Sequence, residues 1–293
     1  MNASAPRVAV PARNLVGESP VWSVAEQALY WVDVEGKRVQ RWDPATNRVR
    51  HWDMGEATGS IGLRRGGGLV AAIRTGFVFL DTETGTLRPI ADPESDKADT
   101  RFNDGKVDRR GRFWAGTRNF RDHSRADGCL YRLDPQLSIH RLLDGIRCPN
   151  GIAWSPDDRT MYLCDTWIRC IFAFDFDADE GVPHNRRLFK ELFPEQGYPD
   201  GLTVDSEGFL WNAHYDGWRI TRYAPDGRVD RIIAMPVQHV TSLAFGGPGL
   251  RTLFVTSSHL RLTDAARAAQ PLAGHVFALE AVTAGIAEPS FAG

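Results

Sequence analysis

The sequence has little cysteine, no long hydrophobic run and no surplus of one charge sign. The four cysteines form no Cys-x-x-Cys pair and are expected to be reduced, packed thiols; they are Cys129, Cys148, Cys164 and Cys170. No stretch approaches the roughly 18 apolar residues of a membrane span. The segment 1–21 also lacks the continuous apolar core of a signal peptide. We therefore expect a cytoplasmic protein without a membrane partner.

The balance of charge excludes another class of partner. The chain has 35 Lys and Arg against 37 Asp and Glu, a net charge of −2. Because binding to a phosphate backbone requires basic side chains in excess, nucleic acid is not an expected partner. Apolar residues make up 42% and charged residues 25% of the 293 positions, as in ordinary globular proteins. The 28 glycines and 17 prolines are a mild excess that indicates many turns.

Several catalytic motifs are missing as well. The eight histidines contain no His-Glu-x-x-His, and there is no Gly-x-Ser-x-Gly, which excludes the usual frames of zinc proteases and serine hydrolases. The glycines of 66–68 do not follow the dinucleotide-binding pattern and indicate a turn. Residues 175–181 resemble the start of an EF-hand loop, but Glu180 and Arg186 occupy the positions that require Gly and Glu. This segment is predicted to be a turn at a sheet edge.

A repeat of about 45 residues runs through the chain. Asp205–Trp211 (DSEGFLW) is similar to Asp108–Trp114 (DRRGRFW), and Ser155–Tyr162 is a looser copy. Each copy is a polar turn followed by the start of an apolar strand. Equivalent positions lie 39 to 49 residues apart, at 31, 70, 114, 162, 211 and 254. Helical periodicity is nearly absent, and short helices are expected at most in 263–269 and 188–192.

Repeats of about 40–50 residues with about four strands each are typical of β-propellers. Six such units predict an all-β, six-bladed propeller with four-stranded antiparallel blades around a central channel. We expect one domain over residues 1–293, with about 1–14 as an N-terminal extension. Two stacked β-sandwiches are the alternative, but they do not account for a period that runs through the middle of the chain.

Each repeat has a polar residue just before its predicted inner strand. In a propeller the first strand of every blade lines the channel, so these residues would form a ring at one mouth: Glu18, Ser60, Asn103, Asn150, Asp200 and Ser242. Asn150 and Asp200 occupy near-identical frames, Pro-Asn-Gly and Pro-Asp-Gly. With Glu18 they would supply an oxygen-only ligand set for a hard divalent cation. Asn-Gly and Asp-Gly are also turn dipeptides, so a purely structural role stays open.

Four motifs resemble the regucalcin and gluconolactonase family, which also includes luciferin-regenerating enzyme and senescence-marker-protein-like sugar lactonases. The motifs are Gly17–Trp22 (GESPVW), Arg101–Lys106 (RFNDGK) with Gly111–Thr117 (GRFWAGT), Cys148–Gly151 (CPNG) and Tyr198–Leu202 (YPDGL). The resemblance runs in order from about residue 18 to residue 277. It implies a six-bladed propeller that holds one divalent cation at its channel.

The resemblance also implies roles for individual residues. Glu18, Asn150 and Asp200 match the family's metal ligands, Asp200 its catalytic residue, and Arg101 and Asn103 its contacts with substrate hydroxyls. The implied reaction is metal-dependent hydrolysis of a sugar lactone, a pentono- or hexono-lactone, to the aldonic acid in carbohydrate catabolism. The cation would be Ca²⁺, Zn²⁺, Mg²⁺, Mn²⁺ or Fe²⁺, and no organic cofactor is needed.

Two other functions stay open at this point. One is a calcium-binding regulatory propeller without turnover, and the other is a hydrolase of other esters or phosphotriesters on the same scaffold. The two are distinguished from a lactonase by turnover and by substrate preference. Arg101 and Asn103 beside the metal ligands favour a polyol substrate, since they would have no role in a plain ion buffer.

One segment departs from the family pattern. After Gly116-Thr117 the family often has Met and then an acidic loop that contacts substrate, whereas this chain has basic and amide side chains in 118–123. The departure concerns the identity of the sugar rather than the chemistry. Arg118 and Asn119 are therefore predicted pocket residues. Further candidates for the pocket are His214, Tyr215, Trp218 and His259.

Overall fold

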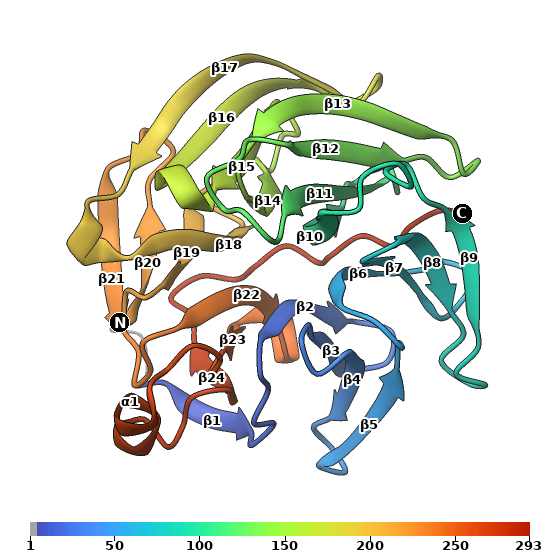
Figure 1. Cartoon of the computed structure of the whole chain (residues 1–293). Coiled ribbons are helices and arrows are strands. Elements are labelled where there is room, and N and C mark those ends of the chain that lie inside the picture. The colour runs from blue at the N-terminus through green and yellow to red at the C-terminus, as the bar shows by residue number, and fades with distance from the viewer. Residues whose placement is uncertain (1–4) are drawn as a thin grey trace.

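The computed structural model describes residues 5–293, which form six four-stranded antiparallel sheets arranged in a ring (Figure 1). The first sheet consists of β2 (Gly17–Ser23), β3 (Ala28–Asp33), β4 (Arg38–Asp43) and β5 (Arg48–Asp53). The second consists of β6 (Thr58–Leu63), β7 (Leu69–Ile73), β8 (Gly76–Leu80) and β9 (Leu87–Ala91). The third consists of β10 (Thr100–Val107), β11 (Phe113–Asn119), β12 (Gly128–Leu133) and β13 (Ile139–Ile146). The next two are β14 (Pro149–Trp154), β15 (Thr160–Asp165), β16 (Cys170–Asp177) and β17 (Val182–Glu191); and β18 (Tyr198–Val204), β19 (Leu210–Tyr215), β20 (Arg219–Tyr223) and β21 (Val229–Ala234). The last is β22 (Val240–Gly246), β23 (Thr252–Ser257), β24 (Val276–Glu280) and β1 (Arg7–Val10).

The arrangement confirms the predicted six-bladed propeller. The inner strands β2, β6, β10, β14, β18 and β22 contact one another in sequence, and β22 contacts β2 to complete the ring. All six repeat positions noted in the sequence lie on the second strand of a blade. The six polar residues of the predicted ring lie within the first few residues of the inner strands; Glu18, Asn103, Asn150 and Asp200 line one cavity there, whereas Ser60 and Ser242 do not.

The last blade combines strands from both ends of the chain. Its outer strand β1 pairs antiparallel with β24, with Arg7 opposite Ala278 and Val10 opposite Val276. Residues 7–10 belong to the segment expected to precede the propeller, and residues 1–4 of that segment lie outside the described residues. Pairing the two ends of the chain in one sheet leaves no open seam in the ring.

The repeated Asp-x-x-Gly-x-x-Trp segment has a structural cause. The carboxylate of Asp205 accepts a hydrogen bond from Nε1 of Trp211 at 2.8 Å and from Nε of Arg222 at 2.9 Å. Asp108 accepts the equivalent bond from Nε1 of Trp114 at 2.9 Å. Both indoles are fully buried. Because a buried indole N–H needs a partner, the Asp and the Trp recur together.

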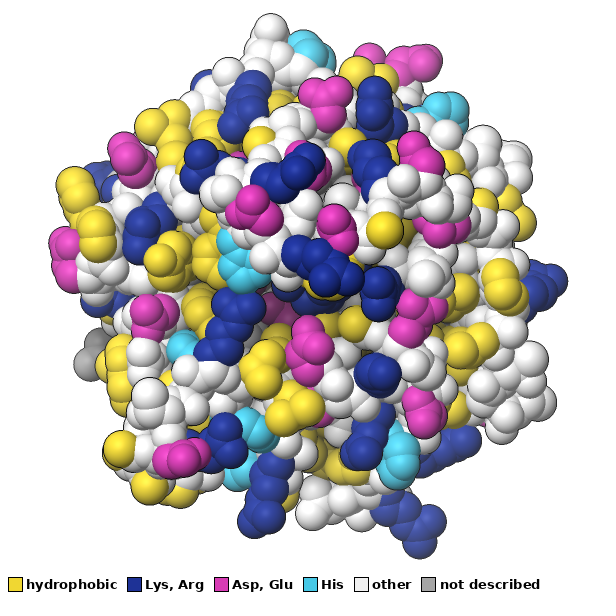
Figure 2. Space-filling model, in the orientation of Figure 1, with side chains coloured by type: hydrophobic (Ala, Val, Ile, Leu, Met, Phe, Trp, Pro, Cys, Tyr) yellow, Lys and Arg dark blue, Asp and Glu magenta, His cyan; other side chains and the backbone are white. Residues whose placement is uncertain are grey.

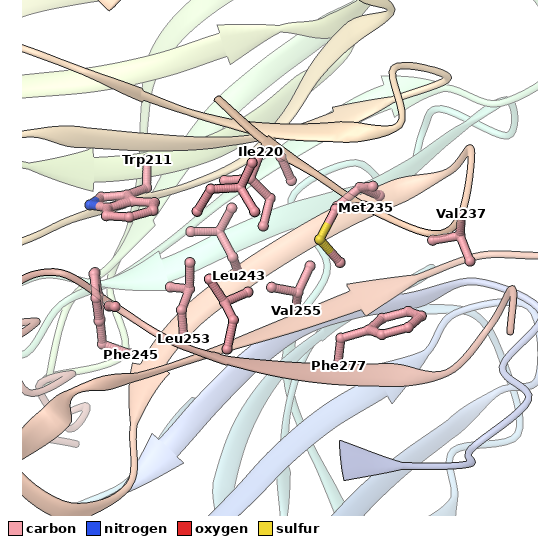
Figure 3. Close-up of a cluster of buried hydrophobic side chains, with 14 of the residues drawn as sticks. Trp211, Ile220, Met235, Val237, Leu243, Phe245, Leu253, Val255 and Phe277 are labelled. Atoms are coloured by element: carbon pink, nitrogen blue, oxygen red, sulfur yellow. The ribbon is translucent and has the colours of Figure 1, made fainter. Parts of the chain in front are cut away.

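The core lies between neighbouring blades. In the cluster between the fifth and sixth blades, Trp211 and Met235 face Leu243, Phe245 and Phe277 (Figure 3). Each such side chain stabilises the fold by about 1.5–3 kcal/mol when fully buried. The propeller therefore gains its stability at the blade interfaces, and the channel is left for polar groups.

The local predictions have mixed outcomes. The predicted turn is confined to 178–181, between β16 and β17, because 175–177 are the end of β16. The helix α1 (Asp264–Ala269) is capped by Thr263, whose Oγ1 accepts from the N–H of Ala266 at 3.2 Å. The short helix expected in 188–192 is wrong, because Leu188 pairs with Phe172 across β17 and β16 and strand pairing overrides local propensity. All four cysteines are free thiols. None of the helices in residues 5–293 is long and apolar enough for a membrane span.

The C-terminal segment crosses the centre of the ring (Figure 1). The N–H of Phe291 donates to the carbonyl of Leu63 at 2.7 Å, and Glu288 pairs with Lys106 at 2.7 Å. Leu63 and Lys106 lie at the ends of inner strands, whereas the ring of polar residues lies at their starts. The C-terminal segment therefore covers the mouth opposite that ring.

Candidate functional site

The starts of the inner strands open into a cavity of about 700 Å³, measured to its open mouth. The five residues that the family resemblance implies all line it: Glu18 on β2, Arg101 and Asn103 on β10, Asn150 on β14 and Asp200 on β18. The lining also includes Glu35, Asp104, Arg118, Thr166, Trp167, Tyr215 and Arg261. The five implied residues, which span 182 positions from Glu18 to Asp200, therefore meet in one place.

Irregularities in the inner strands bring Asn150 and Asp200 close together. The pairing register shifts between Asn150 and Ile152, and again between Pro199 and Leu202. Such bulges re-aim side chains near a barrel or propeller mouth. A Cβ atom at position 151 would lie 2.4 Å from the carbonyl oxygen of Asp200, and φ there is +39°. Glycine is thus required for the close approach of β14 and β18.

Two buried oxygens in the cavity have no hydrogen-bond partner among the described residues. Nδ2 of Asn150 donates to Oγ1 of Thr166 at 3.1 Å, and Thr166 donates to the carbonyl of Pro199 at 2.8 Å. This orientation leaves Oδ1 of Asn150 unpaired, and Oδ1 of Asp200 is also unpaired. A buried acceptor without a partner costs about 1–3 kcal/mol, so a ligand is expected to satisfy both atoms.

The carboxylates of this cavity are held in an unfavourable environment. The pKa of Glu18 is raised well above its usual value by burial and then by the charges of Asp200 and Asp104. The pKa of Asp200 is likewise raised, by burial first and by Asp104 second. The only bond to the Glu18 carboxylate among residues 5–293 comes from the N–H of Ser19 at 3.1 Å. Adjacent buried carboxylates favour a bound cation.

The donor set fits a hard divalent cation. No group of three or more His, Cys, Asp and Glu side chains in residues 5–293 forms a metal cluster. The trio of Glu18, Asn150 and Asp200 differs because its third member is an amide. Carboxylate and amide oxygens are the ligands of Ca²⁺ and Mg²⁺, whereas structural zinc sites use nitrogen and sulfur. The unpaired oxygens of Asn150 and Asp200 are therefore suited to such an ion.

Asp104 is a site residue that the sequence reasoning missed. Its carboxylate accepts from the N–H groups of Gly105 and Gly151, both at 2.8 Å, and so holds the backbone next to Asn150. Burial raises the pKa of Asp104 to about 6, against the opposing effect of these bonds and of Lys106. A signal was present, because Asp104-Gly105 matches the Asn-Gly and Asp-Gly pairs of the next two repeats.

The wall beside the carboxylates is basic. Asn103 donates through Nδ2 to the carbonyl of Pro149 at 3.0 Å and accepts from Nε of Arg118 at 3.0 Å. Arg101 donates to the carbonyl of Phe102 at 3.2 Å. Burial and the nearby charge of Arg118 lower the pKa of Arg101 to about 9. The predicted substrate contacts thus lie within a network that orients them.

Of the further pocket candidates, Arg118 and Tyr215 line the cavity, whereas Asn119 and His214 do not. Successive side chains of a strand face opposite sides, so only one residue of each adjacent pair can reach the cavity. The amide of Asn119 instead accepts from two N–H groups of its own loop. His214 is 1% exposed, donates from Nδ1 to the carbonyl of Gln196 at 2.8 Å and has a pKa lowered to about 4 by burial. The other two candidates, Trp218 and His259, also lie off the cavity.

Several lining residues come from loops and carry no sequence signal. Trp167 lies in a short turn after β15, and its ring stacks on His123 with centroids 4.9 Å apart. Arg261 lies in the segment that follows β23. Neither belongs to the repeat, because blades differ most in the loops that connect their strands.

Comparison with known proteins gives one consistent result. A family profile described as SMP-30/Gluconolactonase/LRE-like region matches residues 16–259. The 6-deoxy-6-sulfogluconolactonase of Pseudomonas putida is 40% identical over 281 residues and covers 96% of both chains. Regucalcin of Xenopus laevis is 37% identical over 284 residues and covers 95% of both.

The similarity extends to solved structures. Regucalcin from Agrobacterium tumefaciens, described as a calcium-binding protein, is 29% identical and superposes with a TM-score of 0.93, over 98% of this chain and 97% of that chain. The propeller, the four motifs and the match over residues 16–259 agree in what they indicate. The chain belongs to the SMP-30/gluconolactonase/LRE-like family.

Proposed function

We propose that this protein is a lactonase that hydrolyses a sugar lactone to the open aldonic acid in carbohydrate catabolism, with a divalent cation held by Glu18, Asn150 and Asp200. The observation that carries the proposal is the pair of buried, unpaired oxygens on Asn150 and Asp200 beside the Glu18 carboxylate. The family membership and the relative named 6-deoxy-6-sulfogluconolactonase support the reaction class.

The chain's own residues account for binding and proton transfer. When bound, a divalent cation supplies Lewis-acid polarisation of the lactone carbonyl. The second carboxylate oxygen of Asp200, Oδ2, would accept a proton from the attacking water, while the unpaired Oδ1 would hold the cation. The water oxygen bonds to the carbonyl carbon, the ring C–O bond breaks, and the released ring oxygen takes up a proton to become a hydroxyl. Asp200 can return the proton it accepted, so the step needs no further reactant.

The wall of the cavity selects a hydroxylated ring. Arg101 and Asn103 present a guanidinium and an amide whose positions are held by bonds to Phe102, Pro149 and Arg118. A lactone without hydroxyls would leave the remaining N–H donors of these two groups without a partner in a buried site, which penalises its binding. We therefore expect aldonolactones to be preferred over simple aliphatic lactones and over aryl esters.

The test is to assay hydrolysis of a panel of five- and six-carbon aldonolactones, with the rate measured as acid released at constant pH. Protein stripped with a chelator should lose turnover and regain it with an added divalent cation. Asp200→Asn should lower kcat/KM at least about 100-fold, within the range for general acid–base groups. Asp226→Asn, which removes an acid from an exposed turn of the same blade, is the matched control and should leave kcat/KM unchanged. Full turnover without a metal, or in Asp200→Asn, would contradict the proposal.

A calcium-binding protein without turnover is the second candidate, supported by the description of the Agrobacterium tumefaciens relative. It predicts that Ca²⁺ binds with one ion per chain while no lactone, ester or phosphotriester of the panel is hydrolysed. Calorimetric titration with Ca²⁺ alongside the lactone panel separates the two functions. Binding together with turnover supports the lactonase.

A further inference from the structure

We infer that the cavity contains an anion-binding subsite formed by Arg101, Arg118 and Arg261, and that the preferred lactone carries an anionic substituent on its sugar chain. The substituent is a tetrahedral or planar oxyanion, namely a sulfonate, a phosphate or a carboxylate. This inference rests on the proposed function, because it names the substrate class of the same site.

The strand register puts two arginines directly opposite each other. Arg101 on β10 pairs with Arg118 on β11, and both line the cavity. Like charges directly opposite in an antiparallel pair are destabilising, so an arrangement of this kind needs a compensating anion. Glu35 approaches Arg101 at 3.5 Å and is 43% exposed. No acidic side chain in residues 5–293 is within ion-pair distance of Arg118.

A third guanidinium comes from outside the third blade. Arg261 lines the same cavity and likewise has no acidic partner within ion-pair distance in the part of the chain that the structure describes. The charges of Arg118, Arg261 and Arg101 all act on His123, where burial and these three groups lower its pKa. All three arginines line this one cavity. Figure 2 shows basic side chains on both sides of the central hollow of this face, with an acidic side chain deeper inside.

The arginines are set apart from the proposed metal ligands by a line of contacts. Arg118 bonds Asn103, and Asn103 bonds the carbonyl of Pro149, which directly precedes Asn150. A lactone with its carbonyl at Asn150 would therefore extend its remaining carbons along Asn103 toward Arg118. A guanidinium binds sulfonate, phosphate or carboxylate oxygens through two parallel N–H groups. A neutral hydroxymethyl group would leave Arg118 and Arg261 without an anionic partner, since Glu35 approaches Arg101 alone among the three.

The first experiment compares lactones that differ only at C6, which carries a hydroxyl, a phosphate, a sulfonate or a carboxylate. With the metal-loaded protein, kcat/KM for the best anionic lactone should exceed that for the neutral lactone about ten- to hundred-fold, as expected for charge-assisted hydrogen bonds. Which of the three anions is best identifies the source of the negative charge. A ratio near one or below it would overturn the inference.

The second experiment assigns the preference to the arginines. Arg118→Met should lower the ratio of kcat/KM for the anionic lactone to kcat/KM for the neutral lactone at least about ten-fold. Arg118→Lys should lower this ratio less, because Lys keeps the charge but lacks the two parallel N–H donors of the guanidinium. Arg121→Met removes the same charge from the neighbouring exposed loop, where Arg121 pairs with Asp99, and should keep the ratio. An equal loss on both lactones in Arg118→Met would show that Arg118 only positions Asn103, and would refute the subsite.

A binding experiment separates failure of the subsite from failure of the proposed function. D-glucitol and D-glucitol 6-phosphate cannot be hydrolysed as lactones, so their affinities report recognition alone. Calorimetry should give about ten-fold tighter binding of the phosphate, weakening with added salt and lost in Arg118→Met. If no lactone is hydrolysed but this preference holds, the proposed function fails and the subsite stands. If lactones are hydrolysed without any preference, the subsite alone fails.

Discussion

Replacing Asp104 by Asn separates the stability of the site from its function. The Asp104 carboxylate accepts two backbone N–H groups, from Gly105 and Gly151, and is fully buried near Glu18 and Asp200. The amide keeps the size but turns one acceptor into a donor, so one N–H loses its partner. At the same time the variant removes a negative charge that burial disfavours. The two effects oppose each other in the free energy of unfolding.

The magnitudes follow from the structure. A pKa raised from 3.8 to about 6 means that ionised Asp104 lowers the stability of the native state by about 3 kcal/mol at pH 8. Because the folded pKa is the higher one, this stability is fully present below about pH 4 and is lost as the pH rises through 6. Leaving one buried N–H unpaired costs about 1–3 kcal/mol. At pH 8 the variant should therefore be as stable as the wild type or more stable by up to about 2 kcal/mol.

Urea unfolding of metal-free protein at pH 5 and pH 8 measures this balance. Between these values the wild type should lose about 1.4 kcal/mol more stability than Asp104→Asn, from the part of the Asp104 titration that lies in this interval. Activity should nevertheless fall about 10- to 100-fold, as for residues that orient metal ligands, because the backbone beside Asn150 is no longer held. Asp81 is the matched control, since it accepts two N–H groups in an exposed turn that lowers its pKa. Asp81→Asn should leave the pH dependence between pH 5 and pH 8 unchanged, because a carboxyl with a lowered pKa titrates below this interval, and should leave activity intact. An Asp104→Asn protein with full activity, or with the wild-type pH dependence, would refute the reasoning.

Two further predictions concern buried groups outside the cavity. The pKa of His214 is lowered to about 4 by burial, so the native state should lose about 3 kcal/mol of stability as the pH falls from 6.5 to 4. In urea titrations, His214→Gln should remove that loss, whereas the control His51→Gln, at an exposed position, should not. Phe291 of the C-terminal segment is fully buried against Phe79, so Phe291→Ala should lower the free energy of unfolding by about 3–5 kcal/mol. A loss below about 1 kcal/mol would show that the segment does not stabilise the ring.

The fold was predictable because one local pattern recurs with a structural cause. The buried indoles of Trp114 and Trp211 each need an acceptor, and Asp108 and Asp205 supply it, so the pattern survives in the sequence. The role of β1 was not predictable in the same way. β1, an outer strand, carries no repeat motif, and its partner β24 lies about 270 residues away in the sequence. Only closure of the ring reveals the pairing of β1 with β24.

The site was predictable where the propeller itself positions a residue and unpredictable where loops do. Glu18, Asn150 and Asp200 lie at the same place on inner strands, so repeat alignment alone brings them to one mouth. Trp167 and Arg261 lie outside the repeated strands, and nothing in their spacing points to the cavity.

Strand alternation explains two of the four predicted pocket residues that do not line the cavity, Asn119 and His214. Asn119 follows Arg118 on β11, and His214 precedes Tyr215 on β19, so each pair could contribute only one side chain to the cavity. Which residue of each pair faces the cavity depends on the hydrogen-bond partners available on the opposite face of the strand. On the opposite face of β19 the neutral imidazole of His214 donates to the carbonyl of Gln196. On the opposite face of β11 the amide oxygen of Asn119 accepts from two loop N–H groups. A guanidinium has donors alone and could not accept from these N–H groups, whereas the amide of Asn119 accepts from both and also donates to Asp127 at 3.1 Å.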